Sequence, residues 1–132
     1  GMFVTMIVGV YDKNKNELLL ANAGHEPPLI FSKDGNFKTI DEAGPPLGIA
    51  PNFKFTEQII SFKESSMYIF TDGITEMKNN NGEMLGQEGF QDYIKKYQTT
   101  PNNKRLQKMI EDLISSGRIQ KDDLTIVTVD GN

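Results

Sequence analysis

The sequence contains 132 residues, with 14 basic and 18 acidic side chains and a net charge of −4. A chain of this length suits one domain with a core of moderate size, and its acidic balance disfavours a nucleic-acid partner, which needs a basic surface. No apolar run approaches the ~20 residues that cross a bilayer, and the absence of cysteine excludes disulfides and thiolate metal sites. We therefore expect a cytoplasmic protein with no segment in a membrane.

The first half of the chain has the pattern of an antiparallel sheet. Short apolar segments between polar turns predict strands over residues 3–11, 17–23, 29–31, 37–40, 53–62 and 67–71. Asp34-Gly35-Asn36 is typical of a hairpin turn between two of these strands. The first strand has apolar residues at both its odd and its even positions, so we expect both of its faces to be covered. Its two sets of side chains are Val4, Met6, Val8 and Val10 on one side and Phe3, Ile7 and Tyr11 on the other.

The second half of the chain changes to a helical pattern. An amphipathic helix is predicted by apolar residues at i, i+3, i+4 and i+7, from Phe90 to Tyr97. A second apolar stripe, from Leu106 to Ile114, predicts another helix that ends at Gly117. Thr100-Pro101 is expected to supply the cap and the first-turn proline of this helix. A last strand over residues 124–129 completes an α+β fold, and residues 1–132 are interpreted as a single domain.

Two acidic turns lie at the ends of apolar strands. Thr71-Asp72-Gly73 follows the strand at 67–71, and an Asp-Gly pair there suits a tight turn in which glycine adopts a positive φ. Asp122-Asp123 leads directly into the last strand. Two carboxylate clusters at strand ends can converge at one edge of a sheet, and hard oxygen ligands of this kind suit Mg²⁺ or Mn²⁺.

Several motifs occur together in the order and spacing of a known family. They are Phe3-Val-Thr5, Ala21-Asn-Ala-Gly-His-Glu-Pro-Pro-Leu29, Gly44-Pro-Pro-Leu-Gly48, Thr71-Asp-Gly-Ile-Thr-Glu76 and Asp122-Asp-Leu-Thr125. Over nearly its whole length the chain resembles the C-terminal part of the SpoIIE/RsbU-type phosphatase domain, a bacterial branch of the metal-dependent type 2C protein phosphatases. The resemblance implies a β-sandwich of mainly antiparallel strands with helices packed on it. It also implies two Mn²⁺ or Mg²⁺ ions and hydrolysis of phosphoserine or phosphothreonine on a partner protein, typically an anti-sigma-factor antagonist in bacterial signalling.

The resemblance also assigns roles to individual residues. Asp72 and Asp122 correspond to metal ligands of the family, and Asp123 stands where relatives often carry Asn, which suggests an auxiliary metal role. His25 and Gly73 are assigned to contacts with the substrate or an accessory metal. For His25 there is a second interpretation, in which the histidine fixes the hairpin turn by hydrogen bonding. Two bound ions would activate water directly, so no covalent nucleophile is expected.

One departure from the family pattern limits these expectations. An upstream segment with further aspartates and a Gly-His-Gly turn, which the family carries, does not precede Phe3 here, so Asp72 and Asp122 would form only part of the site. We therefore expect the chain to be part of a truncated phosphatase domain and to be weakly active or inactive alone. The alternative is a non-catalytic module that binds a phosphoprotein or a regulator. The apolar first strand, lacking a cover, further predicts a homo-oligomer, and the alternative is a monomer in which the loop over residues 42–51 folds over the gap.

Overall fold

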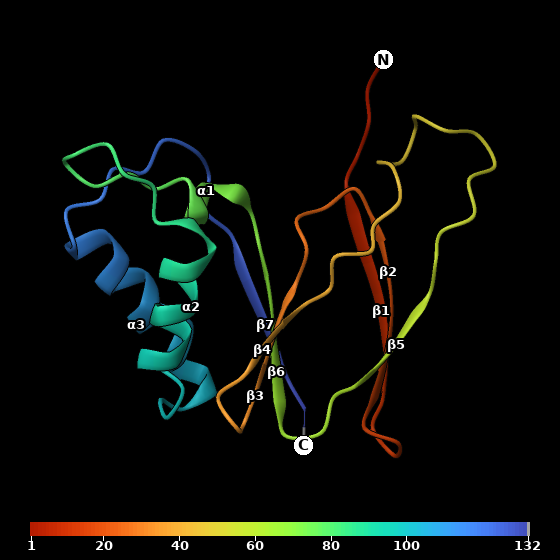
Figure 1. The fold of residues 1–132 in the computed structure, drawn as a ribbon, viewed down its shortest axis with the longest axis horizontal. Helices are drawn as coiled ribbons and strands as arrows, with labels where there is room; N and C mark the ends of the chain where they lie inside the picture. Colours follow the sequence, from red (N-terminus) through yellow and green to blue (C-terminus); the bar gives the residue numbers. More distant parts are fainter. Residues whose placement is uncertain (132) are drawn as a thin grey trace. The chain divides into compact units, whose positions relative to one another are not determined.

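The computed structural model describes residues 1–131 and has an α+β fold (Figure 1). The strands are β1 (Met6–Asp12), β2 (Glu17–Ala23), β3 (Leu29–Ser32), β4 (Phe37–Thr39), β5 (Gln58–Ser61), β6 (Ser65–Phe70) and β7 (Ile126–Asp130). The helices are α1 (Asp72–Thr75), α2 (Gly86–Lys96) and α3 (Asn102–Ser115). The chain divides into two compact units, one formed by residues 1–69 with the C-terminal end from Val129, and the other by residues 70–128. The assignment of the chain to a single domain stays a prediction.

The first unit contains most of the β-sandwich that the family resemblance implies, and β7 runs from the second unit into the first. One sheet has the strand order β1-β2-β5, and the order of the other is β4-β3-β6-β7. The pairs β1–β2, β2–β5, β3–β4 and β3–β6 are all antiparallel. Alternate residues of β2 point inward, and Leu18 and Leu20 are almost fully buried. They belong to a core cluster supplied by both sheets: Leu18, Leu20, Ile30, Ile40, Ile60, Phe62 and Met67.

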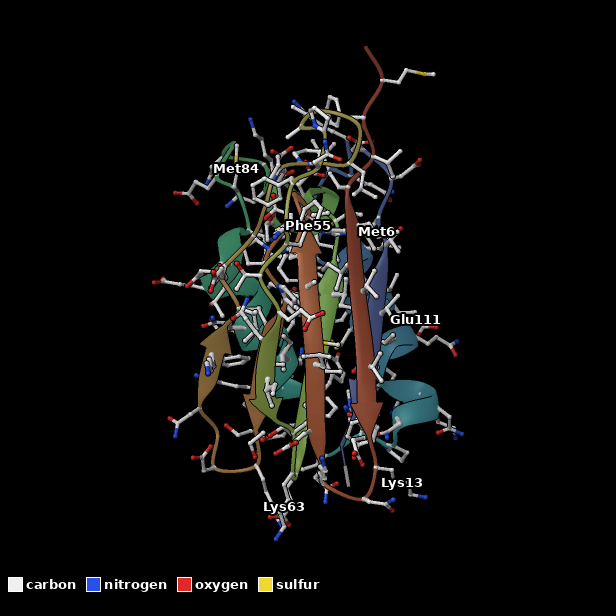
Figure 2. All side chains as sticks on the ribbon, turned by 90° about the vertical axis from the view of Figure 1, so that its right-hand side faces the viewer. Met6, Lys13, Phe55, Lys63, Met84 and Glu111 are labelled. Carbon is white, nitrogen blue, oxygen red and sulfur yellow. The ribbon has the colours of Figure 1, made fainter. Side chains whose placement is uncertain are left out.

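The outer face of the β1-β2-β5 sheet is apolar and largely open to solvent, with Leu47 and Phe55 bordering a hollow beside Met6 and Val8 at one end. Ile7 and Tyr11 of β1 pack against the core, whereas Met6, Val8 and Val10 on the other face are 40%, 55% and 63% exposed. Figure 2 looks onto this face, with Met6 and Phe55 labelled near one end. The expectation that both faces of the first strand are covered is therefore wrong for the single chain. The homo-oligomer inferred from that strand stays a prediction.

Two predicted strands are shorter than expected because a distant loop takes their backbone partners. The first begins at Met6, since the Val4 amide donates to the Leu47 carbonyl at 3.1 Å and Val4 accepts from the Leu47 amide at 2.8 Å. The predicted strand over 53–62 is reduced to β5, whose ladder with β2 stops at the pair Leu20–Gln58. Beyond that point the Asn22 carbonyl accepts from the Gly44 amide at 2.9 Å instead.

The second unit is built mainly from helices around its own buried side chains. Its buried apolar residues are Phe70, Ile74, Met77, Leu85, Phe90, Ile94, Met109 and Leu113. The rings of Phe70 and Phe90 meet edge to face with centroids 4.8 Å apart. Helices α2 and α3 are joined by Asp112, which accepts from Lys96 Nζ at 2.6 Å and from the Tyr97 hydroxyl at 2.8 Å. The helical periodicity thus predicted both amphipathic elements.

Details of the second helix differ from the expectation. Ile114 is 57% exposed, whereas Arg105 is buried, because its guanidinium donates to the Thr100 carbonyl and the Asn102 side chain. Pro101, rather than Thr100, is the N-cap residue, and it makes no side-chain cap. Gly117 does end the helix, with φ of +77° and its amide donating to the Ile114 carbonyl.

Candidate functional site

The two acidic turns meet in the second unit through Thr71. The Thr71 amide donates to the Thr125 carbonyl at 3.1 Å, and the Thr125 amide donates back to Thr71 Oγ1 at 3.1 Å. The same hydroxyl donates to the Asp123 carbonyl at 3.3 Å. These three bonds join two segments that are about fifty residues apart, so the backbones that carry Asp72 and Asp122 lie side by side (Figure 1).

Gly73 makes a close approach between the two turns possible. An ideal Cβ at this position would lie 2.2 Å from the Asp123 carbonyl oxygen and 3.5 Å from the Asp122 carbonyl oxygen. Because 2.2 Å is far inside van der Waals contact, any side chain here would push the turns apart. Gly73 is not among the glycines with positive φ, and Asp72 opens α1 rather than a tight turn. The expected reason for this glycine is therefore wrong: the position needs space, not a left-handed backbone. Its predicted contact with substrate or an accessory metal is a separate matter and stays a prediction.

The acidic side chains at this junction are open to solvent. Asp72, Asp122 and Asp123 are all exposed, and none of them forms an ion pair within residues 1–131. Asp122 Oδ1 accepts from the Asp123 amide at 2.7 Å, while the Asp122 carbonyl accepts from Gln120 Nε2 at 2.9 Å. These bonds fix the backbone of a shallow hollow lined by Gln120, Lys121, Asp122 and Asp123. The remaining carboxylate oxygens are available to a ligand.

The donor set fits a hard divalent cation only in part. Carboxylate oxygens are the ligands that Mg²⁺ and Mn²⁺ prefer, and a Mg²⁺ site commonly uses one or two carboxylates with water. Across the described part of the chain, however, no three His, Cys, Asp or Glu side chains converge on one point. Asp72 and Asp122 can therefore contribute ligands to an ion but do not enclose one. Their assignment as metal ligands, with Asp123 as an auxiliary group, stays a prediction.

His25 lies in the first unit, in a turn that another side chain holds. The Asn22 side chain accepts from the His25 amide at 2.9 Å and donates to the His25 carbonyl at 3.0 Å. The imidazole itself makes no hydrogen bond to the described residues, and its Nδ1 is buried. Hydrogen bonds at His25 thus hold the turn, as the second interpretation expects, but they join the His25 backbone to Asn22 and do not involve the imidazole. The predicted contact of His25 with substrate or an accessory metal stays a prediction.

The residues that sequence reasoning missed are Thr71 and Thr125. Both lie in the quoted motifs, next to the aspartates, yet only the aspartates attracted a functional interpretation. A signal was present, since each acidic group has a threonine close by in sequence, and threonine can satisfy backbone groups through its hydroxyl.

Comparison with solved structures places this architecture among the type 2C phosphatase folds. The RsbU and RsbW domains of Rv1364c from Mycobacterium tuberculosis superpose with a TM-score of 0.75 at 23% identity, covering 94% of this chain and 35% of that one. The phosphatase domain of SpoIIE from Bacillus subtilis, presoaked with Mn, gives a TM-score of 0.70 at 18% identity over 97% of this chain and 56% of that one. The catalytic domain of PstP, solved with two manganese ions, gives 0.65 at 14% identity over 96% and 57% of the two chains. At these identities the matches show the fold.

Sequence comparison then shows the family. The family described as stage II sporulation protein E (SpoIIE) matches residues 1–131, and the chain belongs to this family. Protein IcfG of Synechocystis is 31% identical over 97% of this chain, and phosphoserine phosphatase RsbU of Bacillus subtilis is 28% identical over 97%. The match covers 20% of IcfG and 39% of RsbU, so the chain spans less than half the length of these relatives. None of the helices described here has the length and apolar character needed to cross a bilayer. The cytoplasmic location stays a prediction.

Proposed function

We propose that this chain forms part of a metal-dependent protein phosphatase that removes phosphate from serine or threonine of a partner protein. The observation that carries the proposal is the junction at Thr71, which brings two exposed acidic turns into one place. The fold supports it, because the solved neighbours include phosphatase domains prepared with manganese. The relative RsbU, whose name is phosphoserine phosphatase, supports the choice of phosphoserine.

In this proposal Asp72 and Asp122 hold the metal, and Gly73 keeps their backbones together. A pair of divalent ions supplies a water of lowered pKa and neutralises charge on the phosphoryl oxygens. The chain's own contribution is geometric: Thr71 fixes the distance between the two turns, and the exposed carboxylates offer oxygens without having to break ion pairs first. Asp123 lies beside them. Its backbone amide donates a hydrogen bond to Asp122 Oδ1, which orients the edge of the hollow.

We propose that the substrate is a serine-phosphorylated anti-sigma-factor antagonist. The described residues provide no cluster of three ligand side chains, so a complete two-metal site would need ligands beyond them. We therefore expect the 132-residue chain alone to hydrolyse the substrate slowly, even in excess Mn²⁺.

The test uses the longest protein that the gene encodes. Phosphate release is measured from p-nitrophenyl phosphate and from the phosphorylated antagonist, before and after EDTA and again after Mn²⁺ is restored. We expect activity on both substrates that disappears with EDTA, returns with Mn²⁺ and is lost in Asp72→Asn. Metal-independent turnover, or full activity in Asp72→Asn, would contradict the proposal. Binding of the phosphoprotein without any turnover would instead favour the non-catalytic module.

A further inference from the structure

Three short segments of the second unit form a small antiparallel sheet around Lys78. Lys78 pairs with Met84 on one side and with Ile119 on the other. Its backbone accepts from the Ile119 amide at 2.8 Å, and the neighbouring Leu85 amide donates to the Met77 carbonyl at 2.8 Å. Directly paired residues of antiparallel strands carry their side chains on the same face. Met84, Lys78 and Ile119 therefore form one row, which we call the docking row.

The docking row is open to solvent, whereas the opposite face of the same small sheet is buried. Met84 and Ile119 are 56% and 54% exposed, while Met77 and Leu85 on the other face are 1% and 8% exposed. Lys78 is half-buried between its apolar neighbours, and its ammonium group forms no ion pair in the part of the chain that the structure describes. The stem of a lysine can pack on such neighbours and leave the charge in water. The row thus offers two apolar contacts around one available positive charge.

The segments that carry the docking row are held in place by hydrogen bonds to the backbone. The Asn79 side chain accepts from the amides of Asn81 and Glu83 at 3.0 Å and 2.9 Å, which closes the turn before Met84. Arg118 donates from one guanidinium nitrogen to the carbonyls of Met77 and Glu83, at 3.4 Å and 3.5 Å. A preorganised surface loses little conformational entropy when a partner binds, which favours a role in recognition.

The docking row also lies next to the acidic turns. Ile119 precedes Asp122 by three residues, and three residues span at most about 11 Å of extended chain. A standard protein interface covers about 800 Å² on each partner, equivalent to a disc of roughly 16 Å radius. A folded protein with its phosphorylated side chain at Asp122 would therefore reach the near end of the docking row, at Ile119. A small aryl phosphate would not reach it.

We propose that the docking row binds the body of the phosphorylated protein substrate, next to its phosphoserine. This inference rests on the proposed function. The partner surface that fits is one with an acidic group to pair with Lys78 and apolar side chains to cover Met84 and Ile119. Met84 suits such a contact because methionine adapts its shape to irregular apolar surfaces. The row selects a protein substrate over a small phosphate ester.

The test replaces Met84 and Ile119 by serine, singly and together, in the longest protein that the gene encodes. The matched control is Ile114→Ser, since Ile114 is an apolar residue of the same unit with 57% exposure but lies on α3. We expect the double variant to lose about tenfold or more in kcat/KM toward the phosphorylated antagonist, a size typical of central interface residues. Its hydrolysis of p-nitrophenyl phosphate should change less than twofold, and the control should resemble the unaltered protein on both substrates.

A binding measurement separates failure of the docking row from failure of the proposed function. The dissociation constant for the phosphorylated antagonist is measured in an Asp122→Asn background, with and without the two serine substitutions. Equal affinity with and without them, or no binding at all, would overturn the docking row whatever the catalytic result. If the antagonist binds through the docking row but neither the unaltered protein nor its variants hydrolyse either substrate, the docking row stands and the proposed phosphatase function fails.

Discussion

The acidic junction and the His25 turn are built alike but leave different groups free. In both, a polar side chain holds the backbone through hydrogen bonds: Thr71 joins two distant segments at the junction, and Asn22 closes the turn at His25. At the junction the carboxylates of Asp72 and Asp122 remain exposed and unpaired by cations. At the turn Asn22 is buried, and the imidazole of His25 has no partner among residues 1–131. Two motifs that are equally conspicuous in the sequence thus differ in structure: one exposes carboxylates without ion pairs, and the other buries an imidazole nitrogen without a hydrogen-bond partner among residues 1–131.

The largest expected effect is a loss of activity that differs between substitutions of the two adjacent aspartates of the junction. Asp122→Asn should lower phosphoprotein hydrolysis at least about 100-fold, because transition-state stabilisation by a metal amounts to several kcal/mol and the predicted ligand would lose its charge. Asp123→Asn should cost less than about tenfold, in keeping with an auxiliary role. Steady-state kinetics at saturating Mn²⁺ measures both. The exposed Glu76 provides the control as Glu76→Gln, which should leave the rate unchanged. Equal losses in the two aspartate variants would contradict the assignment.

Gly73→Ala should damage both stability and activity. The added Cβ would lie 2.2 Å from the Asp123 carbonyl oxygen, so one of the two backbones must move. Overpacking of this kind costs about 1–3 kcal/mol, and a displacement of about 1 Å in a site can cost about 100-fold in rate. Thermal unfolding and kinetics measure the two effects.

The matched control for this substitution is Gly9→Ala within β1, where the glycine has no positive φ. There an ideal Cβ would lie 3.4 Å from Leu18 Cδ1 and 3.7 Å from the Leu19 carbonyl oxygen, which are ordinary van der Waals distances, and alanine loses less conformational freedom on folding than glycine. We expect little change in stability or rate. If both glycine-to-alanine substitutions lowered stability and rate equally, loss of backbone flexibility, rather than the close approach at Gly73, would explain the effect.

Asn22→Ala should lower the stability of the fold but leave the acidic junction intact. Two hydrogen bonds to the His25 backbone disappear, and leaving buried polar groups unpaired costs about 1–3 kcal/mol. The affinity for Mn²⁺, measured by calorimetry below the unfolding temperature, should match that of the unaltered protein. A weakened metal affinity would mean that the His25 turn contributes to the metal site after all.

The smallest expected effect concerns the pH dependence of the helical unit. The hydrogen bond from Lys96, followed by that from Tyr97, holds the pKa of Asp112 below its ordinary value of 3.8. A depressed carboxyl pKa stabilises the fold above the unfolded-state pKa, and this contribution disappears as the pH falls through the lower folded-state pKa. Asp112→Asn should therefore lower the free energy of unfolding at pH 7, and the difference from the unaltered protein should vanish in strong acid. A difference that is constant with pH would contradict this account.

Sequence reasoning succeeded where the structural signal was local. A short apolar segment after a polar turn predicted β2 with its observed bounds, and the i, i+3, i+4 pattern at Phe90 predicted α2. The motifs identified the family and placed Asp72 at the end of β6.

It failed where a distant segment decides the local structure. Residues 53–57 have the composition of a strand, but a loop around Gly44 occupies the edge that they would need. The reason for Gly73 could not be read locally either, because the carbonyl that excludes a side chain there belongs to Asp123. Packing between segments about fifty residues apart leaves no periodicity in the sequence.

Paramagnetic broadening by Mn²⁺ tests the central claim directly, since it locates the ion without requiring turnover. Amide resonances of the ¹⁵N-labelled 132-residue chain are recorded while Mn²⁺ is added in substoichiometric amounts. The amides of Gly73, Asp122 and Asp123 should broaden first, while those of Asn22 and His25 remain sharp. Asp122→Asn should abolish the early broadening. Broadening that begins at His25, or that spreads evenly over the exposed carboxylates of the chain, would contradict a metal site at the acidic junction.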